Sequence, residues 1–173
     1  MNFLGYFLQY TADYFLKIDG VVALVVGYLF ARWKFKFESI HERRLEVIEE
    51  AYSKLKLVNR SFRSLTAPLQ EVGDLSESEK EKDFVSKAND MFIYLDTKKL
   101  FFSSEEQKNI DIITNKFFET WNSYRYKNDI KNDPGSQKEI TRLYKEIWDS
   151  TSKEMPGLIL SLEKIFKKAL GLK

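Results

Sequence analysis

The 173-residue chain carries 28 Lys and Arg against 26 Asp and Glu, and a net charge of +2 is too small to indicate nucleic-acid binding by itself. It has no cysteine and one histidine, which excludes disulfides, thiolate metal sites and a histidine-based zinc site within one subunit. Its length suits one compact domain with an appendage.

Charge divides the chain into two segments. Residues 1–31 contain only three charged side chains, and the rest of the chain contains the other 51. A water-soluble domain needs such charges on its surface, and a segment in lipid avoids them. We therefore predict a membrane segment at residues 1–37 and a cytoplasmic helical domain at residues 38–173.

The membrane segment is predicted to contain one spanning helix. Residues 18–31 form an apolar stretch with a single charged residue, Asp19. Extended to about residues 14–35, the stretch is long enough at 1.5 Å per residue to cross a hydrocarbon core of roughly 30 Å. Residues 3–16 are also apolar but too short to span alone, and we predict an interfacial helix there.

Basic and aromatic residues alternate at the end of this stretch. Alternation is typical of a half-buried strand, and basic residues interleaved with aromatic ones also occur in nucleic-acid patches. On a helix these side chains point all round, which suits aromatic rings at the lipid headgroups and cations at the phosphates. We therefore predict a membrane-interface belt consisting of Arg32, Trp33, Lys34, Phe35, Lys36 and Phe37.

The distribution of basic residues predicts the orientation of the span. Residues 1–16 have no Lys or Arg, whereas residues 32–44 have five. The positive-inside rule then places the N-terminus outside and the C-terminal domain in the cytoplasm. No basic region precedes the stretch and no A-x-A cleavage site follows it, so we expect it to remain as a signal anchor.

Small residues recur along the predicted span at a spacing of about one helical turn. A face of this kind lets helices approach closely in lipid and would support a homo-oligomer, although Gly and Ala are common in membrane helices and the spacing also arises by chance. The predicted helix-association face consists of Gly20, Ala23, Gly27 and Ala31.

A heptad pattern follows the belt, from Ser39 to Leu69. Its two seams consist of Ile48, Leu55, Phe62 and Leu69 and of Ala51, Val58 and Leu65. Such a helix forms either a two-stranded coiled coil or one wall of a bundle, and the amphipathic segments that follow in the chain favour the bundle. We expect the helix to weaken near Pro68.

Three capping patterns, a Ser followed three residues later by Glu, predict the starts of later helices. They are Ser76 with Glu79, Ser103 with Glu106, and Ser136 with Glu139. Pro156 and Gly157 are predicted to interrupt the chain and start a last helix that Gly171 ends. The predicted fold class is all-α: an N-terminal transmembrane helix continuing into a cytoplasmic antiparallel bundle of four to five helices.

The helical domain lacks recognisable catalytic patterns. No phosphate loop or nucleophile elbow occurs, and His41 alone supplies neither a catalytic triad nor a di-iron site. Adjacent carboxylates such as Glu49 and Glu50 point apart on a helix, which suits solvation. We expect a non-enzymatic protein without catalytic residues, cofactor, metal, small-molecule substrate or direct nucleic-acid readout.

Two features of the domain suggest interactions. The last helix is amphipathic and basic, so it either binds a partner or anionic lipid or packs its apolar face in the bundle and solvates its lysines, and the second reading is favoured. The Phe101–Phe102 pair between two helices is expected to be tucked under the bundle. The candidate partner or lipid face consists of Lys164, Lys167, Lys168 and Lys173.

Three stretches, RRLEVIEEAYSKL, YLDTKKLFFSSEEQKNID and IWDSTSKEMPGLILSLEKIFKKALGL, give the chain a resemblance to a loose group of uncharacterised bacterial proteins. These have one N-terminal span and a helical cytoplasmic domain, and the resemblance covers most of residues 40–172. The resemblance implies a bacterial protein but no activity and no site residues, and with the predicted orientation it leads us to expect a location in the bacterial inner membrane. Proteins of this design also occur as membrane effectors of anti-phage systems, a link by association only.

Two functions therefore stay open. The first is a membrane-anchored scaffold or adaptor that recruits, or is held by, a cytoplasmic protein. The alternative is a toxin-like effector whose N-terminal helices perturb the bilayer on release or clustering. A third possibility, a soluble protein with its N-terminus in the core, carries less weight because the domain is self-sufficient.

Overall fold

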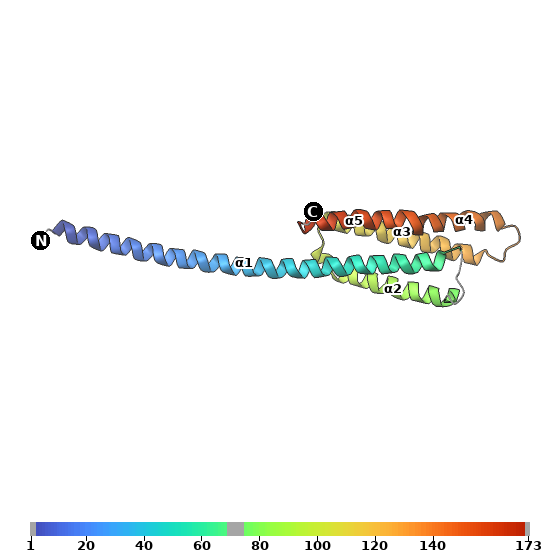
Figure 1. The fold of residues 1–173 in the computed structure, drawn as a ribbon, viewed down its shortest axis with the longest axis horizontal. Coiled ribbons are helices and arrows are strands. Elements are labelled where there is room, and N and C mark those ends of the chain that lie inside the picture. Colours follow the sequence, from blue (N-terminus) through green and yellow to red (C-terminus); the bar gives the residue numbers. More distant parts are fainter. Residues whose placement is uncertain (1–2, 69–74, 172–173) are drawn as a thin grey trace. The chain divides into compact units, whose positions relative to one another are not determined.

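The computed structural model describes the backbone of residues 3–68 and 75–171, and the side chains of these ranges from residue 22 onward. All regular secondary structure within these ranges is helical, which confirms the all-α prediction (Figure 1). The chain divides into two compact units, residues 1–44 and 45–173.

The described part of the first unit, residues 3–44, lies within α1, which spans Phe3–Thr66. The backbone is helical through both the predicted interfacial segment 3–16 and the predicted span 14–35, with no break between them. Side chains of residues 1–21 lie outside the described part. From residue 22 to residue 40 every side chain is exposed, because a single helix has no partner within this unit to cover it.

No helix is both long and apolar enough to cross a bilayer when the search is confined to the part of the chain that the structure describes. The first eight residues of the predicted span, 14–21, have side chains outside that part.

The second unit is a bundle formed by the end of α1 and four later helices. These are α2 (Glu77–Thr97), α3 (Ser104–Asp129), α4 (Gln137–Asp149) and α5 (Met155–Ala169). The short 3-10 helix η1 (Lys99–Phe101) joins α2 to α3. Side-chain pairs show that α2 runs antiparallel to α1, since Lys54 meets Asp90 and Ser61 meets Asp83.

The heptad seams of α1 form the centre of this bundle. Five of the predicted seam residues are at most 3% exposed: Ile48, Ala51, Leu55, Val58 and Phe62. Leu65 is 5% exposed, and Leu69 lies outside the described residues. The Phe62 ring stacks on Phe84 of α2 with centroids 4.2 Å apart. The prediction of a bundle wall is confirmed, because the partner helices come from the same chain.

Two of the three capping predictions are confirmed. Ser76 and Ser103 have extended backbones and form complete capping boxes with Glu79 and Glu106. The third is right about the helix start, since α4 begins at Gln137 directly after Ser136, but wrong about the cap. Ser136 makes no side-chain cap, because its backbone has ψ 0° and not the extended conformation that a capping side chain requires.

The prediction at Pro156 is confirmed in part: Pro156 lies in the first turn of the last helix, α5, but the chain does not leave the helical conformation before it. A π-helical turn, η2 (Ser150–Glu154), joins α4 directly to α5, so that the two helices follow one another in line (Figure 1). In this turn the Met155 N–H donates to the Ser150 carbonyl, five residues back. The wider turn immediately precedes Pro156, whose ring would clash with a carbonyl four residues back in a regular helix.

Candidate docking groove between α1 and α5

The residues of the predicted belt are exposed along one helix. Trp33 lies between two Phe rings, with centroids 6.2 Å from Phe30 and 5.6 Å from Phe37. Lys34 pairs with Glu38 at 3.8 Å, a surface ion pair of small energetic value. All six belt residues, Arg32, Trp33, Lys34, Phe35, Lys36 and Phe37, remain open to solvent or lipid.

The other predicted residues fall into two groups. Ala23, Gly27 and Ala31 of the small-residue face are exposed, and Gly20 lies outside the described side chains. Lys164, Lys167 and Lys168 are exposed on α5, while Lys173 lies outside the described residues. Lys167 pairs with Glu163 at 2.7 Å. On its other face α5 buries Ile159, Leu162 and Phe166, so the helix is part of the bundle whatever else its lysines bind.

An open groove of about 820 Å³ lies between α1 and α5, and sequence reasoning missed it. Sequence patterns find core faces but not the line where two helices from opposite ends of the chain leave a gap. We call it the α1/α5 groove. It is lined by Glu49, Tyr52, Ser53, Lys56, Leu57, Asn59, Arg60 and Arg63 of α1 and by Pro156, Ile159, Leu160 and Glu163 of α5.

The groove combines apolar and charged surfaces. Leu57 and Leu160 are 47% and 52% exposed within it. The Arg63 guanidinium lies 5.7 Å from the centre of the Trp148 ring, and Lys56 lies 5.3 Å from the Tyr52 ring, so both cations have aromatic support. Apolar positions between long cationic side chains suit an amphipathic helix with acidic flanks.

One polar bridge crosses the groove. The Tyr52 hydroxyl of α1 donates to a Glu163 carboxylate oxygen of α5. Burial, followed by this bond, raises the pKa of Tyr52 to about 12. The ion pair with Lys167, followed by the tyrosine, lowers the pKa of Glu163. At neutral pH the bridge therefore joins a neutral phenol to an ionised carboxylate and fixes the spacing of the two helices.

The groove also contains an unused acceptor. The Asn59 Oδ1 is buried, and no donor reaches it from the residues that the structure describes. Burying an acceptor without a partner costs about 1–3 kcal/mol.

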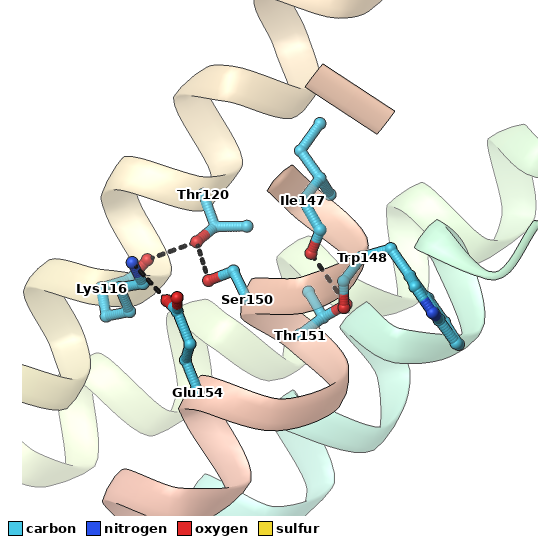
Figure 2. A network of polar contacts seen from close by, with 7 residues as sticks. All are labelled: Lys116, Thr120, Ile147, Trp148, Ser150, Thr151 and Glu154. Carbon is cyan, nitrogen blue, oxygen red and sulfur yellow. Dashed lines mark hydrogen bonds and ion pairs between the residues drawn. The ribbon is translucent and has the colours of Figure 1, made fainter. Parts of the chain in front are cut away.

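A buried polar layer surrounds the π-turn. Figure 2 shows Thr120 of α3 meeting Ser150 at 2.8 Å, with Lys116 and Glu154 paired at 2.6 Å nearby. Thr151 contacts Thr66 of α1 at 3.0 Å. These contacts join η2 to two other helices. They satisfy hydroxyls that would otherwise be buried alone, so we assign the layer to packing specificity.

A lysine, Lys127, is buried near the C-terminal end of α3. The Lys127 amine lies 4.6 Å from the Tyr124 ring centre and 4.2 Å from that of Tyr144, and the residue is 5% exposed. Burial lowers the pKa of Lys127, and the nearby Glu77 partly opposes this. Sequence gives no signal for this residue, since most helical lysines are solvated. Two rings cover the amine, an arrangement that suits packing of α3 against α4.

Metal binding has no support in the described residues, where no three His, Asp or Glu side chains come together. Comparisons with known proteins yield no matching family model, no matching curated protein and no matching solved structure. The candidate function therefore depends on the geometry of this chain alone.

Proposed function

We propose that this protein is a non-enzymatic scaffold, anchored in the bacterial inner membrane by its N-terminal helix, whose bundle binds a cytoplasmic protein. One observation carries the proposal: eleven large apolar side chains between residues 22 and 40 are each 52–75% exposed. Water-soluble monomers rarely leave so large an apolar surface uncovered, and lipid covers it without a second protein.

The bundle contributes the binding surface. Its core is closed by its own helices, so the bundle needs no partner to fold, and the α1/α5 groove stays open. The exposed Leu57 and Leu160 and the neighbouring cations suit an amphipathic helix of a partner protein. We propose this groove as the recruitment site.

Topology is tested with single cysteines, which are unambiguous because the chain has none of its own. The variants are Asn2→Cys and Ser86→Cys in the full-length protein. In intact cells we expect a membrane-impermeant maleimide to label position 2 and not position 86, with the protein in the membrane fraction. Recovery in the soluble fraction without detergent would refute the anchor.

Partner binding is tested by crosslinking in cells. Leu160→Glu places a charge in the groove and should abolish a stoichiometric crosslinked product. Ile93→Glu is the matched control, because Ile93 is 67% exposed on α2 outside the groove. Equal products from both variants would refute the groove as the recruitment site.

A second candidate function is the membrane-perturbing effector. It is favoured by the exposed face of Ala23, Gly27 and Ala31, which lets a second helix approach closely. Dye entry on induction of the full chain distinguishes the two: the effector depolarises cells, and the scaffold leaves them intact.

A further inference from the structure

Leu100 is the most exposed large apolar residue among those described, at 97%. It lies in η1, at the tip of the connection between α2 and α3. Single exposed leucines are common on protein surfaces, so exposure alone assigns no role. Two further observations bear on the role of Leu100: the hydrogen bonds that hold the turn and the position of the turn in the bundle.

The turn is rigid. The Phe101 N–H donates to the Lys98 carbonyl at 2.9 Å, and the Phe102 N–H donates to the Lys99 carbonyl at 3.1 Å. From α3, the Gln107 amide donates to the carbonyls of Lys99 and Phe102 at 3.1 and 2.9 Å. Leu100 is therefore held outward by fixed backbone, and its exposure does not come from a loose loop.

The turn is also attached to the basic end of α5. Phe102 is buried, and its ring stacks on Phe166 with centroids 6.1 Å apart. Lys167 and Lys168 follow Phe166 directly, and Lys99 is exposed beside Leu100. An apolar tip with lysines around it is the usual form of a protein surface that enters the headgroup layer.

Carboxylates also occur at this end of the bundle. Asp96 and Glu105 are exposed at the adjoining helix ends, and Glu46 is exposed at the start of the bundle part of α1. Lys98, Lys99 and Lys168 equal these in number, and Lys167 is paired with Glu163 at 2.7 Å, so the tip has no excess of positive charge. Apolar insertion of Leu100 is thus the main contribution, and anionic lipid assists it.

Chain connectivity favours lipid as the binding partner of the η1 tip. The α2 end at Thr97 lies beside the start of the bundle part of α1, since the Tyr94 hydroxyl donates to the Val47 carbonyl at 3.3 Å. Seven residues, 38–44, separate Leu45 from the belt, and a chain of that length reaches at most about 28 Å. If the belt lies at the headgroups, as the proposed function requires, this end of the bundle stays within reach of the same bilayer.

We propose that the η1 tip, Leu100 with Lys99 and the α5 lysines Lys167 and Lys168, inserts into the surface of the membrane that holds the N-terminal helix. The inference depends on the proposed anchor. Contact at a second point would limit rotation of the bundle about the anchor and give the α1/α5 groove a fixed orientation toward the cytoplasm.

The test uses the full-length protein in phospholipid vesicles with and without an anionic lipid. Leu100→Cys carries an environment-sensitive NBD dye, and Asn122→Cys on α3, about 27 Å further along that helix from its first residue, is the control. We expect the emission at position 100 to shift to the blue and to be quenched by a spin label placed high in the lipid chain, with no quenching at position 122. Adding Lys99→Glu and Lys168→Glu to Leu100→Cys should remove the dependence on anionic lipid.

Flotation of the same samples separates the two proposals. Protein that floats with the vesicles while positions 100 and 122 respond alike overturns the tip insertion and leaves the anchor in place. A blue shift at position 100 that the lipid-borne quencher does not affect means that protein covers the tip, and this also overturns the inference. Protein that does not float overturns the anchor and the tip together.

Discussion

The buried hydroxyl pair Thr66 and Thr151 provides a quantitative test of how η2 packs on α1. The two oxygens lie 3.0 Å apart, and each also lies near a carbonyl of its own helix: Phe62 at 2.9 Å for Thr66 and Ile147 at 3.0 Å for Thr151. Two hydroxyl protons serve three close contacts, so one contact lacks a proton at any moment. Removing one hydroxyl therefore leaves the other fully bonded to its own helix.

Thr151→Val keeps the shape of the side chain and removes only the hydroxyl. The cost should be that of one net hydrogen bond, about 1 kcal/mol, because no buried group is left unpaired. For a unit of this size that corresponds to a fall of about 3–5 °C in Tm. Thr66→Val should cost about the same. The double variant should cost about 2 kcal/mol, the sum of the two, because the remaining hydroxyl's bond to its own helix is then lost as well.

Urea unfolding of the full chain in a mild non-ionic detergent, followed by Trp fluorescence, measures these values. Thr141→Val is the matched control, since its hydroxyl bonds only the Gln137 carbonyl of its own helix at 2.9 Å and is exposed. We expect its effect to stay within about 0.5 kcal/mol. A double variant that costs no more than either single change, or a cost above about 3 kcal/mol for one hydroxyl, would contradict this count of hydrogen bonds.

Three further predictions concern the bundle. Ser103→Ala should destabilise it by about 1 kcal/mol through loss of a helix cap, whereas Ser136→Ala, at a position without a side-chain cap, should be nearly neutral; thermal unfolding compares the two. Phe62→Ala should cost about 3–5 kcal/mol, because the ring is fully buried at the centre of the core, and a Tm within a few degrees of the parent would contradict its placement. Tyr52→Phe should lower stability most at neutral pH. Because the pKa of Glu163 is lowered in the folded protein, its contribution to stability is fully present above the carboxyl's unfolded pKa, about 4.3. This contribution is lost as the pH falls through the folded pKa. Because the pKa of Tyr52 is raised in the folded protein, its contribution to stability is fully present below about pH 10 and is lost as the pH rises toward about 12. Unfolding at pH 3, 7 and 11 checks this, and a difference from the parent that does not change with pH would count against the bridge.

Local chemistry explains which sequence predictions hold. The heptad seam and the caps at Ser76 and Ser103 depend on residues a few positions apart, and the structure confirms them. The cap at Ser136 fails because the backbone there departs from the conformation that the motif requires. A capping pattern specifies side chains and not the ψ angle that the preceding turn imposes.

The sequence by itself determined the helical class, the core face of α1 and the contrast between a charge-poor N-terminal segment and a charged bundle. These features can be predicted from periodicity and composition, because they depend on the local spacing of apolar residues and on whether each residue favours water or an apolar environment. Only the tertiary structure decided that a π-turn joins α4 to α5, that Lys127 lies between two rings, and that a groove opens between α1 and α5. Each results from contacts between segments far apart in the chain, whose geometry no local pattern encodes.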